Sequence, residues 1–62
     1  MKRRDLVRHL ESKECTFLRE GGNHTVYENQ VNRRKSTVPR HTEVPNNLVK
    51  KICRDLGITE PI

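Results

Sequence analysis

The chain is poor in the residues that build large cores and stacking surfaces. Of its 62 residues only 31% are hydrophobic, and one Phe, one Tyr and no Trp supply the aromatic rings. A domain of this length buries only about 60% of the surface of its unfolded chain. We therefore expect a single domain, residues 1–62, with no cofactor and no second lobe. Interleaved aromatic residues are also missing, so we do not expect readout of an RNA sequence through stacked bases.

Cysteines and long apolar segments are scarce as well. The chain has two cysteines, too few for a disulfide framework, and we expect Cys15 and Cys53 to be thiols of the core. Zinc bound by the cysteines and histidines is the alternative, but the close ligand pairs of small zinc domains are missing, so we expect no metal. No apolar run is long enough for a membrane span or a signal-peptide core. These features predict a cytoplasmic protein without a membrane partner.

Positive charge is abundant. Lys and Arg number 13 against 8 acidic residues, which gives a net charge of +5. Such a field attracts polyanions, so it favours nucleic acid or an acidic protein surface as the partner. Solubility alone is the simpler explanation of the same charge. No pair of helices resembles a helix-turn-helix, and we expect no direct DNA binding by the isolated chain.

The hydrophobic periodicity predicts a helix, three strands and a second helix. Apolar residues at helical spacing mark the two helices, and alternating runs bounded by turn residues mark the strands. The expected elements are a helix over 2–13, strands over 15–19, 24–28 and 33–38, and a helix that Asn46 or Asn47 caps and that ends at 56. Short connections predict an antiparallel meander with both helices on one face, an α+β fold. We expect Phe17 in the core and Tyr27 packed on the sheet.

The segment around His24 is the most informative one. Gly21, Gly22 and Asn23 form a turn directly before this histidine, which opens the second strand and shares a face with Val26. Imidazole has an unperturbed pKa of roughly 6.5, so it can both accept and donate a proton near neutral pH. RNA carries its own nucleophile, the 2′-hydroxyl, so its cleavage needs an acid, a base and cations near the phosphate. His24 is therefore a candidate catalytic residue, with an RNA contact or a structural role as the alternatives.

Basic residues close to this turn and on the third strand are candidates for phosphate contacts. We assign this possible RNA-binding role to Arg19, Arg33, Arg34, Lys35, Arg40 and His41. A solvated surface is the competing interpretation of the charged run 33–35, and His41 can equally position its own loop. The third strand runs antiparallel to the strand of His24, and this predicts a basic strand face beside the histidine.

Four short motifs, in this order, resemble the HicA family, the toxins of HicA–HicB toxin–antitoxin systems. They are Arg4-Asp5-Leu6-Val7-Arg8-His9-Leu10-Glu11, Arg19-Glu20-Gly21-Gly22-Asn23-His24, Val38-Pro39-Arg40-His41 and the helix from Leu48 to Gly57. The chain departs from the family at Asn23, where a serine is usual, and at Glu14, where a glycine is common. The second departure concerns the backbone of the first loop.

The resemblance implies a fold similar to a double-stranded RNA-binding domain and an endoribonuclease that cleaves messenger RNA without a metal. It makes His24 the catalytic histidine and implies a HicB-like antitoxin as the protein partner, with operator binding left to that antitoxin. The alternative function is a non-catalytic binding module of the double-stranded-RNA type. Such a module needs the basic surface but has no use for a reactive histidine beside a glycine turn.

Overall fold

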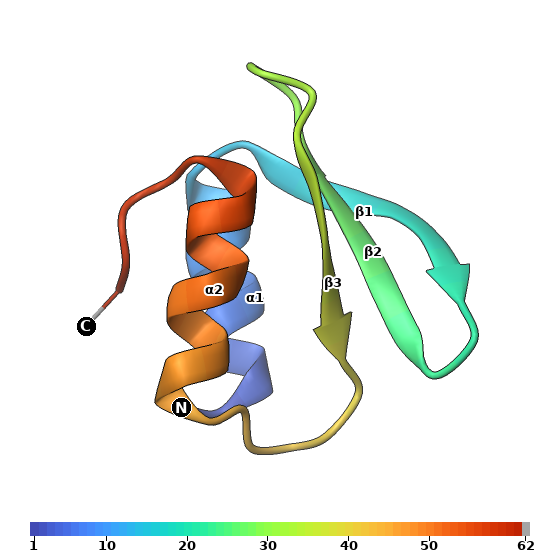
Figure 1. The fold of residues 1–62 in the computed structure, drawn as a ribbon, viewed down its shortest axis with the longest axis vertical. Helices are drawn as coiled ribbons and strands as arrows, with labels where there is room; N and C mark the ends of the chain where they lie inside the picture. Colours follow the sequence, from blue (N-terminus) through green and yellow to red (C-terminus); the bar gives the residue numbers. More distant parts are fainter. Residues whose placement is uncertain (62) are drawn as a thin grey trace.

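Two helices cover one face of a three-stranded antiparallel sheet, as a computed structural model of residues 1–61 shows (Figure 1). The elements in chain order are α1 (Arg3–Ser12), β1 (Cys15–Gly21), β2 (His24–Asn29), β3 (Lys35–Pro39) and α2 (Asn46–Leu56). The strands lie in the order β1-β2-β3, so each pairs with its neighbour in sequence. The predicted α+β fold and the meander are confirmed. Within residues 1–61 no helix is long and apolar enough to span a membrane.

The core lies between the sheet and the two helices. It consists of Leu6 and Leu10 of α1, Cys15, Tyr27 and Val38 of the sheet, Val44, and Val49, Ile52, Cys53 and Leu56 of α2. Both cysteines are buried and free, as predicted, and burial raises the pKa of each thiol. The prediction for Phe17 is wrong, because its side chain is 55% exposed on the edge strand β1. An edge strand has a neighbour on one side only, and this leaves the ring without full cover.

The third strand is shorter than predicted. It begins at Lys35 and not at Arg33, because Arg33 has a left-handed backbone (φ 65°) that a β-strand does not accommodate. Pro39 is its last residue, as expected for a residue that lacks an N–H for the ladder. The first two strands run slightly further than predicted, to Gly21 and Asn29. The hairpin loop between them is therefore only two residues long.

The start of α2 differs from the expected cap. Neither Asn46 nor Asn47 caps the helix, because Pro45 occupies the N-cap position with an extended backbone (φ −58°, ψ 147°). Its carbonyl accepts the first helical hydrogen bonds, from the N–H groups of Leu48 and Val49. No side chain of residues 1–61 caps this helix start. At the other end Gly57 takes the left-handed conformation (φ 72°), as the sequence predicts.

The backbone at Glu14 has the conformation that a glycine, common in the family at this position, would favour. It follows α1 with φ 65°, in the left-handed region where a glycine is free of strain. Its carbonyl accepts a hydrogen bond from the backbone N–H of Gln30 at 2.8 Å. The chain thus keeps the backbone path that a glycine would favour and uses it to tie α1 to the end of β2.

Candidate functional site at the His24 end of the sheet

The two-residue hairpin loop exposes His24 at one end of the sheet. Gly21 pairs with His24 across the loop, and His24 pairs with Pro39 on the other side. Only Gly22 has positive φ (57°), whereas Asn23 does not, which is the pattern of a type II′ hairpin turn with glycine first. Asparagine therefore meets no backbone strain where the family has serine. The histidine is exposed, and its neighbours on both sides are fixed by strand pairing.

A β-bulge decides which side chains share a face with His24. The register of β1 against β2 shifts at Leu18, so that Phe17 pairs with Tyr27 and Arg19 pairs with Val26. Side chains alternate along a strand, and one extra residue moves every later side chain to the opposite face. Arg19 consequently lies on the face of Val26 and His24, the face that the helices leave uncovered.

Arg19 reaches toward the histidine across Gly21. Its Nη1 lies 3.3 Å from the place where a Cβ on Gly21 would be, and Val26 lies 3.6 Å from the same point. Because Gly21 has no side chain, the guanidinium lies over the residue that pairs with His24. Two of the predicted residues, Arg19 and His24, are thus brought together on one surface.

The opposite face of the same sheet end carries a polar network. Arg3, the first residue of α1, donates from Nε to the carbonyl of Pro39 (2.9 Å) and from Nη2 to Thr25 Oγ1 (3.2 Å). Thr25 Oγ1 donates to Glu20 Oε1 at 3.3 Å, and Arg40 forms an ion pair with the same carboxylate oxygen. The hydrogen bond from Arg40 is the main reason why the pKa of Glu20 lies below its usual range. The network joins α1, β1, β2 and the segment after β3.

A hollow of about 340 Å³ opens beside this network. It is lined by Lys2, Arg3, Arg4, Arg40 and Thr42. Backbone hydrogen bonds hold its walls together, from Arg3 N–H to the Thr42 carbonyl (2.7 Å) and from Val44 N–H to the Met1 carbonyl (2.8 Å). The predicted residue Arg40 is one of its cations.

Sequence reasoning missed the contribution of Lys2, Arg3 and Arg4 to this end of the sheet. The available signal was three consecutive cations that lie off the apolar stripe of the first helix. Arg3 bonds to Pro39, 36 residues away, and Lys2 pairs with the still more distant Glu43, so no local pattern indicated these contacts. His41, the weaker histidine candidate, follows Arg40 in the exposed segment after β3.

The other predicted cations lie at the opposite end of the sheet. In the antiparallel register His24 pairs with Pro39, whereas Lys35 pairs with Glu28. The expectation that residues 33–35 form a basic face beside His24 is therefore corrected, because the length of β2 separates them (Figure 1).

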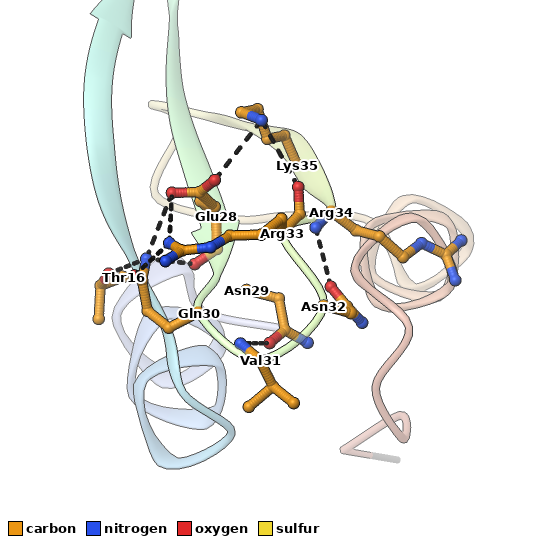
Figure 2. A network of polar contacts seen from close by, with 9 residues as sticks. All are labelled: Thr16, Glu28, Asn29, Gln30, Val31, Asn32, Arg33, Arg34 and Lys35. Atoms are coloured by element: carbon orange, nitrogen blue, oxygen red, sulfur yellow. Dashed lines mark hydrogen bonds and ion pairs between the residues drawn. The ribbon is translucent and has the colours of Figure 1, made fainter.

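Acidic and backbone acceptors already engage these three side chains, and Figure 2 shows the contacts of Arg33 and Lys35 with Glu28. Glu28 pairs with Arg33 (3.8 Å) and Lys35 (3.5 Å). Arg34 donates from Nη2 to the carbonyl of Arg54 in the last turn of α2, at 2.9 Å. Arg34 thus caps a helix end, and Glu28 screens the charges of the other two.

Amide side chains of the same loop, residues 29–34, complete the cap. Asn29 Nδ2 and Asn32 Nδ2 both donate to the carbonyl of Leu56, at 2.9 and 3.1 Å. The Oδ1 atoms of the same two residues accept the backbone N–H groups of Val31 and Arg34, each at 2.8 Å (Figure 2). Carbonyls at a helix C-terminus lack partners inside the helix, so these bonds satisfy them. At this end of the sheet, residues 29–34 therefore fix the sheet to the C-terminus of α2.

Residues 1–61 contain no group of three or more His, Cys, Asp or Glu side chains arranged to hold a metal ion. The chemistry that the His24 turn offers is that of an exposed imidazole between two sets of cations. Arg19 lies on the same face of the sheet as His24, and Arg3 and Arg40 lie on the opposite face. Such a site can exchange a proton and attract an anion.

This helix–sheet–helix architecture, with a histidine exposed at a cationic sheet end, defines a small α+β domain suited to a polyanionic ligand. Residues 3–58 match the model of the family described as the HicA toxin of bacterial toxin–antitoxin systems. The match covers nearly the whole chain, and the protein belongs to the HicA toxin family. Comparison with curated proteins and with solved structures gave no significant match.

Proposed function

We propose that this protein is an endoribonuclease that cleaves messenger RNA in the cytoplasm, with His24 as its general acid–base residue. The observation that carries the proposal is the position of His24 in a chain of a toxin family. It is exposed at the sheet end, beside a glycine turn, with the Arg19 guanidinium on the same face. His24 supplies one acid–base group and Arg19 one cation, two of the groups that RNA cleavage by an internal nucleophile needs.

The reaction that fits this site is transesterification within the RNA. The 2′-hydroxyl loses its proton and its oxygen attacks the adjacent phosphorus, while the bond to the 5′-oxygen of the next nucleotide breaks and that oxygen takes up a proton. The products are a 2′,3′-cyclic phosphate and a 5′-hydroxyl. His24 accepts the proton of the 2′-hydroxyl or donates the proton to the 5′-oxygen, and water exchanges the other proton. Arg19 stabilises the charge that develops on the phosphate oxygens.

The test compares an RNA oligomer with the same oligomer carrying a single 2′-deoxy nucleotide at the cleavage position. We expect the wild-type protein to cut the RNA, to leave a cyclic phosphate and to spare the modified bond. Cleavage of the 2′-deoxy bond would exclude the internal nucleophile. RNA binding without any cleavage would instead favour the non-catalytic binding module.

We further propose that an acidic, HicB-like antitoxin covers the His24 end and so blocks RNA access. The family supplies the toxin of toxin–antitoxin pairs, and the net charge of +5 favours an acidic protein partner. Binding of the antitoxin should protect residues 19–26 from hydrogen exchange, and the complex should not cleave RNA. Protection confined to the outer face of α2, with the complex still active, would contradict this mode of inhibition.

A further inference from the structure

We propose that the hollow at the start of α1 is a second phosphate-binding subsite, which holds an RNA phosphate next to the scissile one and in which Glu20 competes with the RNA for Arg40. This inference rests on the proposed function, because it assigns a role in the same RNA complex. It concerns residues that lie outside the His24 turn and that come from separate segments of the chain.

The charge of the hollow is the first observation. Four of its five lining residues are cationic, namely Lys2, Arg3, Arg4 and Arg40. Lys2 is paired with Glu43 at 3.2 Å and Arg40 with Glu20, whereas Arg4 forms no ion pair with any residue of the described chain. Two of the four charges are therefore not balanced by a carboxylate, and an anion that enters the hollow meets both.

Arg3 is the better placed of these two charges. Its guanidinium is fixed by two neutral oxygens, the Pro39 carbonyl and Thr25 Oγ1, at 2.9 and 3.2 Å. Neutral acceptors position a cation without cancelling its charge. A guanidinium held in this way is prepared for an anion before the anion arrives, and little side-chain entropy remains to be lost on binding.

Glu20 occupies the position of a phosphate oxygen beside Arg40. Its Oε1 accepts a hydrogen bond from Arg40 Nε at 3.1 Å and forms the ion pair with Arg40 Nη2. Arginine recognises carboxylates and phosphates through the same planar set of donors. A phosphate in the hollow can therefore take over Arg40, and the exposed Glu20 carboxylate is released to water.

The hollow adjoins the catalytic histidine but lies on the other face of the sheet. Pro39 pairs with His24, accepts the Arg3 hydrogen bond through its carbonyl and is followed directly by Arg40. Thr25, next to His24, faces the helices and contacts Arg3. An RNA strand that passes around the sheet end would place one phosphate beside His24 and Arg19 and a neighbouring one in the hollow.

The experiment measures binding of a fluorescent, single-stranded 2′-O-methyl RNA oligomer by anisotropy over a series of salt concentrations. This RNA lacks the nucleophilic hydroxyl, so the result does not depend on whether His24 is catalytic. The double variant Arg4→Gln/Arg40→Gln is compared with Lys50→Gln/Arg54→Gln, which removes the same charge from exposed positions on α2. Circular dichroism confirms that each variant is folded.

Loss of one phosphate contact should weaken binding about five-fold at 0.1 M salt and make the log–log salt slope about 0.7 less negative. The α2 variant should change the affinity less than two-fold and keep the slope. Glu20→Gln should bind the RNA more tightly than wild type. Equal losses in both double variants, or unchanged binding in the first, would overturn the subsite, and Glu20→Gln binding no tighter would overturn the competition.

Cleavage assays separate this inference from the proposed function. If His24→Ala still cleaves RNA while the Arg4/Arg40 variant loses affinity and slope, the subsite stands and the catalytic assignment falls. If the Arg4/Arg40 variant binds RNA normally but no longer captures the antitoxin, the hollow is a protein contact and the subsite is overturned.

Discussion

The two ends of the sheet use arginine in opposite ways. At the end formed by the loop 29–34, Arg34 and two asparagines satisfy the last carbonyls of α2. Glu28 pairs there with Arg33 and Lys35, as Figure 2 shows. At the His24 end, Arg3 is held by neutral oxygens and Arg19 lies over a glycine. The first arrangement neutralises its cations or uses them to cap a helix, whereas at the second Arg40 is paired with Glu20 but Arg3 and Arg19 form no ion pair with a carboxylate of residues 1–61. A basic run in a sequence therefore does not by itself mark the functional surface.

The strongest test of this contrast is the removal of His24. His24→Ala should lower RNA cleavage by roughly 10²–10⁴-fold, which is the usual contribution of a general acid–base group. The fold should survive, because the side chain is exposed. The matched control is His9→Gln, since the one hydrogen bond of the His9 ring within residues 1–61 joins it to the Thr59 carbonyl (2.8 Å) and the ring should be dispensable for cleavage. Equal cleavage rates for wild type and His24→Ala would remove the histidine from the site.

Replacing either of two glycines by alanine compares the packing at the two ends of the sheet. Gly57 and Gly22 both have positive φ (72° and 57°), but a Cβ on Gly57 would lie 2.8 Å from Asn32 Nδ2, whereas nothing lies within 4 Å of one on Gly22. Backbone strain costs about 1–2 kcal/mol at either position. Gly57→Ala should lose about 1 kcal/mol more because the helix cap must also shift.

Thermal melts measure this difference. With about 4–8 °C of Tm for each kcal/mol in a domain of this size, Gly57→Ala should melt roughly 10 °C below wild type and clearly below Gly22→Ala. RNA cleavage per folded molecule should be unchanged in Gly57→Ala, because the cap lies at the far end of the sheet. A larger loss of Tm in Gly22→Ala would mean that the hairpin turn, and not the helix cap, tolerates an added Cβ less well.

The ion pair between Glu20 and Arg40 predicts a modest pH effect. Arg40 holds the pKa of Glu20 below its usual range, so the folded state binds the proton less well than the unfolded chain does. The stabilisation is then present above the unfolded pKa of about 4.3 and is lost as the pH falls through the lower folded value. Glu20→Gln should be less stable than wild type at pH 7, and the two melting curves should converge at acid pH, once the pH lies below the folded-state pKa of Glu20. A constant difference across that range would show that the effect is not electrostatic.

The smallest expected effect is that of a chelator. The proposed chemistry relies on His24 and on arginine charges, so excess EDTA should leave the cleavage rate within about two-fold of its value without chelator. The measurement is the initial rate with and without EDTA at constant ionic strength. Complete loss, restored by one divalent metal, would contradict the proposed mechanism.

Much of the architecture follows from local patterns. The apolar spacing of α2 predicts its buried residues, the two glycines predict the hairpin, and both cysteines belong to the core as their chemistry suggests. The predictions that Asn46 or Asn47 caps α2 and that Phe17 is buried were wrong, because both features depend on neighbouring residues and strands. The cap position was decided by the extended backbone of Pro45, and the exposure of Phe17 by the edge position of its strand.

The sequence by itself determined the order of the elements and the place of His24 beside a tight turn, since periodicity and glycine conformation act over a few residues. Only the tertiary structure decided what surrounds that histidine. The bulge at Leu18 turns Arg19 to the face of His24, and the contact between Arg3 and Pro39 spans 36 residues. A one-residue register shift leaves no local signature, and a contact between distant residues exists only after the sheet and α1 have packed together.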